Sequence, residues 1–202
     1  MIYRNIFRFG FAIVVFMASF GTAPAMNILP ERERTTSLNS VLPDDKKKIA
    51  DFDFVDFDGK KRKFSEFKGK VVLIDFWATW CGPCLADIPK LKKLYETYKG
   101  QGFEIFGMNA ETIGDEDPSA DPQAAKESAA RAKQIVKARG VTWLQADAKT
   151  SLPIATKVFG VTALPTKIIV DGEGNILATI GEKDDTEKIV AGIMTAGSTT
   201  KE

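Results

Sequence analysis

The sequence contains no histidine, and its two cysteines, Cys81 and Cys84, are the only ones in the chain. Without histidine, the chain cannot build a Ser–His or Cys–His nucleophile pair or a histidine-ligated metal site. Two cysteines are also too few for a cysteine-rich zinc site or a disulfide framework. The chain also has no large excess of positive or negative charge. Its 28 basic residues nearly balance its 27 acidic ones, which gives no electrostatic case for nucleic-acid binding. Any thiol chemistry must therefore use this one pair.

The N-terminal segment has the pattern of an export signal. Arg4 and Arg8 precede an apolar run at 9–20, and small residues follow with Ala23 and Ala25 at the spacing of a cleavage site. The run is shorter than the roughly 20 residues that span a bilayer. We therefore expect cleavage, with an uncleaved form tethered to the inner membrane as the alternative. Export would place the two cysteines in an oxidising compartment, the periplasm or cell envelope.

We expect three parts in the chain: a signal peptide at 1–25, a polar linker at 26–48 and a folded domain at 49–202. The linker is predicted from its mixed charges and a run of three lysines, which are typical of a solvated segment. In the domain, strand and helix patterns alternate and a hairpin closes the chain, so we predict an α/β fold, a mixed β-sheet covered by helices on both faces. The expected strands are 71–77, 103–109, 141–144, 167–170 and 176–180. The expected helices follow Cys84 and cover 123–139, 152–159 and a last segment capped by Asp184 and Glu187.

The motif that carries chemistry is Cys81-Gly82-Pro83-Cys84, between a buried strand and an amphipathic helix. The first cysteine falls at the helix N-terminus, where free backbone N–H groups and the helix dipole favour a thiolate. A thiolate is the nucleophile of disulfide exchange, so we assign Cys81 as the nucleophile and Cys84, one turn deeper, as the resolving cysteine. A purely structural disulfide is the alternative, but so short a loop restrains almost no chain.

At residues 72–84 the sequence VLIDFWATWCGPC resembles the active-site segment of thioredoxins. The export signal, the opening segment 52–70 and an inserted loop and helix at 110–139 resemble the TlpA/ResA-like branch of that family. The resemblance covers about residues 49–196. It implies a thioredoxin-like three-layer fold with an N-terminal β-hairpin extension and a βα insertion. Pro89 matches the proline that kinks the family's active-site helix.

The resemblance also implies roles for two carboxylates. Asp75, whose apolar neighbours predict burial, matches the aspartate that accepts the proton of the buried cysteine in thioredoxins. Asp87 lies on the Cys84 face of the helix and matches an acidic position beside the cysteines of TlpA/ResA-like proteins. Thioredoxins pair the buried aspartate with a lysine from the second central strand, and the matching segment 103–109 contains none.

Substrate-binding residues are expected around the cysteine pair. Leu164 and Pro165 resemble the family's cis-proline loop, which lies against the disulfide and receives the substrate chain. We expect Trp80, Gly82 and Pro83 to line the same surface. The cofactor is expected to be the redox-active Cys81–Cys84 disulfide itself, with no metal site.

The resulting hypothesis is an exported thiol–disulfide oxidoreductase of the bacterial cell envelope that reduces protein disulfides. The Gly-Pro dipeptide shared with thioredoxins implies a reducing pair. By resemblance, apocytochrome c is a candidate among the protein substrates, in cytochrome c maturation, and a membrane thiol-transfer protein is the expected electron donor. We expect the chain to act as a monomer and without nucleic acid.

Three other functions are alternatives to this one. A disulfide oxidase or isomerase would use the same residues and differ in the reduction potential of the pair. A Cu(I)-binding chaperone would use both thiolates, but related copper carriers add a histidine, which this chain lacks. A peroxidase is disfavoured because no Pro-x-x-x-Thr-x-x-Cys motif surrounds Cys81.

Overall fold

The computed structural model describes residues 47–114 and 122–198. The predicted signal peptide and nearly all of the predicted linker lie outside these residues. The strands are β1 (Asp53–Val55), β2 (Lys61–Lys63), β3 (Val71–Trp77), β4 (Phe103–Asn109), β5 (Leu144–Ala146), β6 (Thr166–Val170) and β7 (Ile176–Ile180). The α-helices are α1 (Gly82–Tyr98), α2 (Pro122–Ala138), α3 (Ala148–Ile154) and α4 (Thr186–Ser198). Shorter helical turns are η2 (Phe64–Phe67), η3 (Lys99–Gln101) and the π-helical η4 (Ala155–Phe159).

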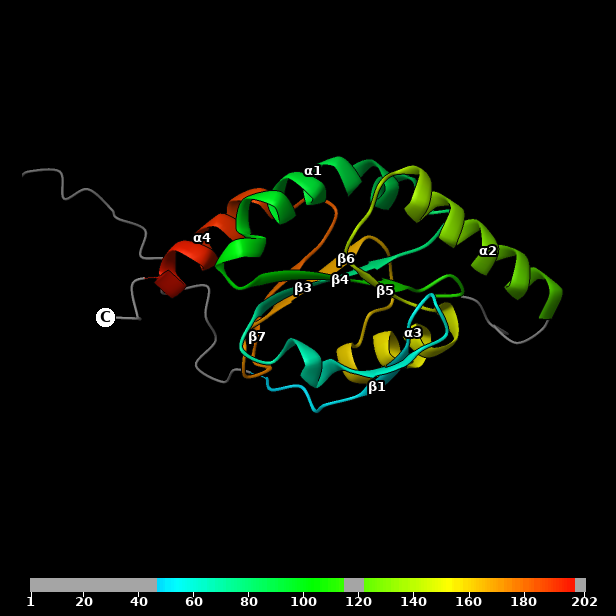
Figure 1. Cartoon of the computed structure of the whole chain (residues 1–202), viewed down its shortest axis with the longest axis horizontal. Helices are drawn as coiled ribbons and strands as arrows, with labels where there is room; N and C mark the ends of the chain where they lie inside the picture. The colour runs from blue at the N-terminus through cyan, green and yellow to red at the C-terminus, as the bar shows by residue number, and fades with distance from the viewer. Residues whose placement is uncertain (1–46, 115–121, 199–202) are drawn as a thin grey trace, which may run out of the picture. The chain divides into compact units, whose positions relative to one another are not determined.

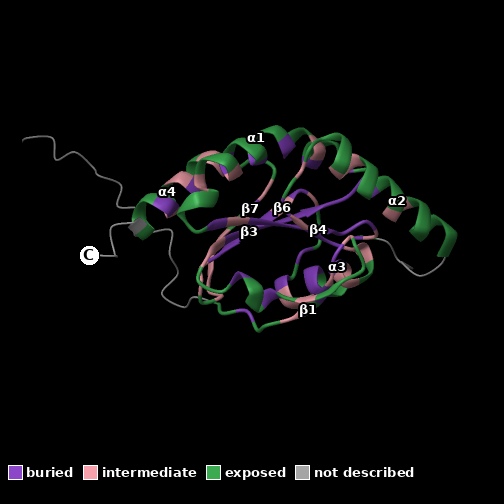
Figure 2. Cartoon of the chain, in the orientation of Figure 1, coloured by how far each residue is buried: buried purple, intermediate pink, exposed green. Residues whose placement is uncertain are grey.

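The main sheet has five strands in the order β5-β4-β3-β6-β7. β3 pairs in parallel with β4 and antiparallel with β6, so the sheet is mixed, as predicted. The near-continuous apolar run of β3 fits this central place, because a central strand is buried on both faces. Figure 2 shows the burial concentrated in the central strands. The sheet and its helices form a thioredoxin-like fold.

Helices cover both faces of this sheet. α1, α2 and α4 lie on one side, and α3 lies on the other side with the β1–β2 hairpin (Figure 1). The core between the sheet and α1 and α4 contains Leu73, Ile88, Leu91, Ile105, Ile169 and Val190. The core on the opposite face contains Phe54, Phe64, Phe67, Phe76, Phe106 and Ile154. β3 contributes to both cores through alternating residues, which fixes which of its side chains face α1.

The N-terminal extension pairs with both outer strands of the sheet. At β5, the backbone N–H of Phe57 donates to the Gln145 carbonyl at 3.0 Å, and Asp56 forms a β-bridge with Ala146. At the start of β7, Lys48 forms a second antiparallel bridge with Asn175. The expected hairpin extension is therefore present and is tied to the edges of the sheet.

Two of the predicted boundaries are wrong. Strand β5 begins at Leu144 rather than Val141, because the Val141 N–H donates to the Val136 carbonyl and closes the end of α2. Helix α3 begins at Ala148 rather than Leu152, because Asp147 caps it by accepting the Thr150 N–H at 2.8 Å. In both cases the apolar pattern identified buried residues but not the turn or the polar cap that sets where the element begins.

The cap predicted for the last helix is also corrected. The side chain of Asp185, not Asp184, accepts an N–H of the first turn of α4, from Lys188 at 3.0 Å. Asp184 instead accepts the N–H of Gly181 at 2.8 Å and closes the turn that precedes the helix. Two adjacent aspartates offered the same signal, and the turn geometry decided between them.

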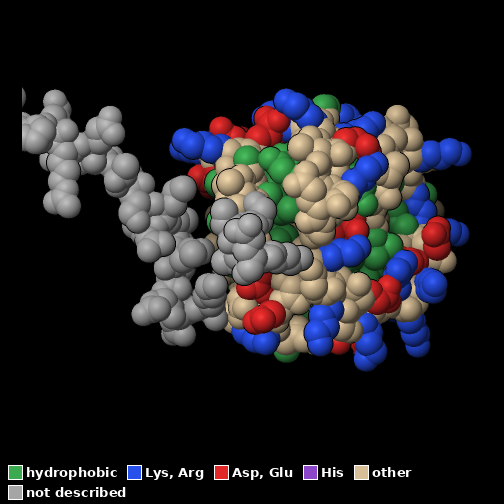
Figure 3. All heavy atoms as spheres, turned by 60° about the vertical axis from the view of Figure 1, so that its left-hand side comes forward, with side chains coloured by type: hydrophobic (Ala, Val, Ile, Leu, Met, Phe, Trp, Pro, Cys, Tyr) green, Lys and Arg blue, Asp and Glu red, His purple; other side chains and the backbone are tan. Residues whose placement is uncertain are grey.

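The surface mixes both signs of charge. Figure 3 shows basic and acidic side chains close together on one face, with hydrophobic side chains between them. Across residues 47–114 and 122–198, no helix is long and apolar enough to cross a membrane.

Candidate active site

The cysteine pair lies where β3 ends and α1 begins. Cys81 is the N-cap residue of α1 and Cys84 lies in its first turn, and a disulfide joins them with their Cα atoms 5.3 Å apart. The Cys84 N–H donates to the Cys81 sulfur at 3.3 Å. A helix N-terminus directs its unpaired N–H groups at this sulfur, so the site would stabilise a Cys81 thiolate after reduction. Gly82 and Pro83 are exposed at the surface of the turn.

Trp80 directly precedes Cys81 in the chain. It is the one large hydrophobic residue exposed among the described residues, with 56% of its surface accessible. Its indole N–H donates to the backbone carbonyl of Glu111 at 2.7 Å, which fixes the orientation of the ring. An exposed aromatic ring held in one orientation suits contact with a second polypeptide.

Glu111 is a buried carboxylate that the sequence-based hypothesis did not include. It accepts the Thr79 N–H at 2.9 Å, the Thr79 hydroxyl and the Asn109 side-chain amide at 3.1 Å. These bonds anchor the loop that leads from β3 to Cys81. The sequence signal for Glu111 was its position. Asn109 is the last residue of β4 and Glu111 follows it by two residues, at the edge where the carboxyl ends of the parallel strands β3 and β4 meet.

The segment before β6 completes the surface around the disulfide. The Leu164–Pro165 peptide bond is cis, as the resemblance implied. Pro165 is buried, and Leu164 packs against the cluster that contains Cys81 and Cys84. Residues far apart in the chain, on the β3–α1 turn and before β6, therefore form one surface.

Asp75 lies beneath the pair and is buried, with 4% of its surface exposed. Asp75 and Cys84 line the same small cavity of about 10 Å³, which has room for about one water molecule. Among the described residues, no group forms a hydrogen bond with Asp75 Oδ1. Burial raises the pKa of Asp75 to about 6, with the charge of Lys167 opposing the shift and that of Asp87 adding to it. The predicted burial is therefore confirmed.

Asp87 takes part in a partly buried ion pair. Lys167 Nζ lies 2.8 Å from Asp87 Oδ2, and Lys90 Nζ lies 3.4 Å from Asp87 Oδ1. Burial opposes the ionisation of Asp87, but the hydrogen bond and charge of Lys167, helped by Lys90, hold its pKa below the ordinary value. Lys167 is also the β6 partner of Asp75 on β3, so one lysine lies near both carboxylates.

The lysine absent from 103–109 is supplied by a different strand. Lys167 lies on β6, directly opposite Asp75 on β3. The available signal was a single charged residue within the apolar run of residues 167–170, the same signal that marked Asp75. Two charged residues on different strands meet only if those strands are neighbours in the sheet, and the local sequence does not show the order of the strands.

A disulfide at the N-terminus of the first long helix, next to a cis-proline loop on a thioredoxin-like sheet, defines the chain as a thiol–disulfide oxidoreductase. The family model described as Redoxin matches residues 43–194, and the chain belongs to this family.

Similar proteins carry the same class of activity in their names. The thiol-disulfide oxidoreductase ResA of Bacillus thuringiensis subsp. konkukian is 31% identical over 143 residues, which cover 71% of this chain and 73% of that protein. The ResA of Geobacillus thermodenitrificans is 27% identical over 183 residues, 91% of this chain and 85% of that protein. Among solved structures, a thiol-disulfide oxidoreductase from Bacteroides fragilis aligns with a TM-score of 0.57 at 25% identity, covering 74% of this chain and 98% of that chain.

Proposed function

We propose that this oxidoreductase reduces protein disulfides in the bacterial cell envelope, with Cys81 as the nucleophile and Cys84 as the resolving cysteine. The observation that carries the proposal is the position of Cys81 as the N-cap of α1, between exposed Trp80 and the cis-proline loop. Both cysteines are buried, with 3% of Cys81 and 2% of Cys84 exposed, and Cys84 lines the same small cavity as Asp75. The helix N-terminus therefore supports Cys81 as the nucleophile, and the shared cavity supports Asp75 as the base for Cys84.

The reaction begins with the reduced pair. The Cys81 thiolate attacks one sulfur of the substrate disulfide, forming a mixed disulfide, and the other substrate sulfur leaves as a thiolate. Cys84 then loses its proton and attacks the Cys81 sulfur. The Cys81–Cys84 disulfide forms, the mixed disulfide breaks, and the second substrate thiolate leaves. Two electrons pass from the dithiol to the substrate, and the disulfide form described above is the product state.

Asp75 is the proposed acceptor of the Cys84 proton. A carboxylate that titrates near pH 6 is ionised in most molecules at neutral pH, yet it is far more basic than an ordinary aspartate. Direct contact is not required, because the cavity between Asp75 and Cys84 has room for about one bridging water. The surface proposed to receive the substrate chain consists of the exposed Trp80, Gly82 and Pro83 together with the cis-proline loop, in which Leu164 is half-buried and Pro165 is buried.

The cellular setting follows from the predicted export signal and from the relatives named ResA. We place the protein in the periplasm or cell envelope, where a reductase needs electrons from a membrane thiol-transfer protein. Apocytochrome c, whose haem-site cysteines must be reduced before haem attachment, is the proposed substrate among envelope disulfide proteins.

The reduction potential of the pair tests the direction of the reaction. The protein without residues 1–25 would be equilibrated against glutathione and dithiothreitol buffers, with the Cys84→Ser variant as the control that cannot form the disulfide. A value near −270 mV, the potential of thioredoxin, supports a reductase, whereas a value near −120 mV, that of a strong oxidant, identifies a disulfide donor and overturns the proposal.

A further inference from the structure

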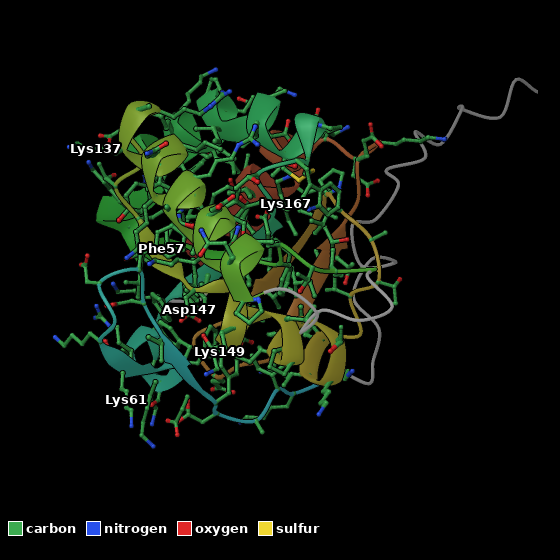
Figure 4. All side chains as sticks on the ribbon, turned by 90° about the vertical axis from the view of Figure 1, so that its right-hand side faces the viewer. Phe57, Lys61, Lys137, Asp147, Lys149 and Lys167 are labelled. Carbon is green, nitrogen blue, oxygen red and sulfur yellow. A yellow bond between two sulfur atoms is a disulfide. The ribbon has the colours of Figure 1, made fainter. Side chains whose placement is uncertain are left out.

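One lysine is buried at the redox site. Only 2% of the surface of Lys167 is exposed, which is rare for a lysine and requires a charged partner. Directly opposite residues of antiparallel strands point to the same face of a sheet, so Lys167 of β6 and Asp75 of β3 both point toward α1. Figure 4 shows Lys167 inside the molecule, whereas Lys61 and Lys137 extend from its rim.

Two carboxylates lie near this lysine. Asp87 on α1 is bonded to it at 2.8 Å, and Asp75 lies next to it on β3. Lys90 is the other cation at Asp87, at 3.4 Å, but its side chain is 62% exposed. The strand neighbours on the remaining sides carry no charge; they are Gly107 of β4, opposite Asp75, and Ile180 of β7, opposite Lys167.

We propose that Lys167 is the counter-ion that joins Asp75 and Asp87 into one partly buried charge cluster beside Cys84, and that this cluster sets the pH range in which Cys84 resolves a mixed disulfide. The inference rests on the proposed function, because it assigns a partner to the proposed base. Lys167 is bonded to Asp87 and not to a sulfur atom, so it acts as a positioning residue.

The cluster acts on the resolving step through Asp75. When Cys84 attacks Cys81, the Cys84 proton passes to Asp75, the new S–S bond forms, and the substrate sulfur leaves with the electron pair of the mixed disulfide. Asp75 takes the proton only while it is ionised. The positive charge of Lys167 favours this ionised form, and the negative charge of Asp87 opposes it.

Lys167 and Asp87 therefore act on Asp75 with opposite signs, although they are bonded to each other. Removing the charge of the lysine makes Asp75 harder to ionise, so resolution requires a higher pH. Removing the charge of Asp87 makes Asp75 easier to ionise, so resolution extends to a lower pH. A merely structural ion pair predicts the same direction for both substitutions, because either one breaks the same bond.

Stopped-flow reduction of 5,5′-dithiobis(2-nitrobenzoate) by the reduced protein without residues 1–25 separates the two steps. The first thionitrobenzoate released reports the attack by Cys81, and the second reports the resolution by Cys84. We expect Lys167→Met to move the pH midpoint of the second phase upward by about one unit, a roughly 5-fold slower phase at pH 6, and Asp87→Asn to move it downward. Lys167→Arg should restore the midpoint.

Lys90→Met is the matched control, because it removes an exposed lysine that contacts the same Asp87 carboxylate. Its midpoint should stay close to that of the parent chain, since solvent screens an exposed charge. Midpoints that shift in the same direction for Lys167→Met and Asp87→Asn, or an unchanged midpoint in Lys167→Met, overturn the inference. If Lys167→Met does not fold, the direction of the Asp87→Asn shift decides alone.

A further variant separates this inference from the proposed function. Cys84→Ser should abolish the second phase while leaving the first. If the second phase persists in Cys84→Ser, the assignment of the resolving cysteine fails, whatever Lys167 does. If it is abolished and Lys167→Met behaves as the parent chain, only the role of Lys167 is refuted.

Discussion

Asp75 gives a quantitative test of the electrostatics at the redox site. Burial raises its pKa from 3.8 to about 6 in the folded protein. The unfolded chain exposes this carboxyl to water, where the ordinary value applies. At about 1.36 kcal/mol for each pH unit between the two values, holding the ionised carboxylate costs the folded state roughly 3 kcal/mol.

The sign of the effect follows from the raised pKa. Below pH 4 the carboxyl is protonated in both states and adds no pH-dependent cost. Above pH 6 the folded state holds a buried carboxylate, so this group lowers the free energy of unfolding as the pH rises through that window. Asp75→Asn removes the titration and keeps the shape. Between pH 4 and pH 7, we expect the variant to gain about 3 kcal/mol of stability relative to the parent chain.

Urea unfolding at pH 4, 5, 6 and 7, with the Cys81–Cys84 disulfide intact, measures this difference. Comparing each protein with itself at two pH values cancels the fixed cost of burying an amide. Asp53→Asn is the control, since the Asp53 side chain is 77% exposed, and its pH dependence should match that of the parent chain. Parallel pH profiles for Asp75→Asn and the parent would show that this carboxyl does not titrate in the window and would refute the reasoning.

Three further predictions concern packing, recognition and capping. Gly107→Ala should lower the free energy of unfolding in urea by about 1–3 kcal/mol, because its Cβ would overlap the side chain of Gln145, which accepts the Trp77 indole N–H at 2.9 Å. Trp80→Ala should slow the reduction of a protein disulfide roughly 10-fold, since that ring is the exposed contact, while the rate with oxidised glutathione stays near that of the parent. Asp185→Ala should cost about 1 kcal/mol in thermal or urea unfolding through the lost cap of α4; an unchanged stability would assign the cap elsewhere.

Much of the site could be predicted from the sequence because its parts are close together in the chain. The run 71–77 and the motif that begins at Cys81 are local signals of a buried strand and a helix start, and both are confirmed. Burial of Asp75 also follows from its immediate neighbours. The local signals are strong wherever one strand or one helix turn contains the whole pattern.

The rest depends on which elements become neighbours. Lys167 meets the carboxylates only because β6 pairs with β3, and no local pattern encodes that pairing. Glu111 was missed for a related reason, since two of its hydrogen-bond partners are a backbone N–H and a side-chain hydroxyl of Thr79 on another loop. The predicted start of β5 is wrong because the Val141 N–H is hydrogen-bonded to the Val136 carbonyl at the end of α2.

The contacts of the N-terminal extension with the two outer strands have a consequence for self-association. An outer strand with unpaired N–H and C=O groups is a template onto which a strand of another molecule can add. Phe57 and Asp56 occupy such groups at β5, and Lys48 does so at the start of β7. One short stretch of chain therefore occupies part of β5 and the start of β7, which reduces the length of open edge available for edge-to-edge aggregation of the folded domain.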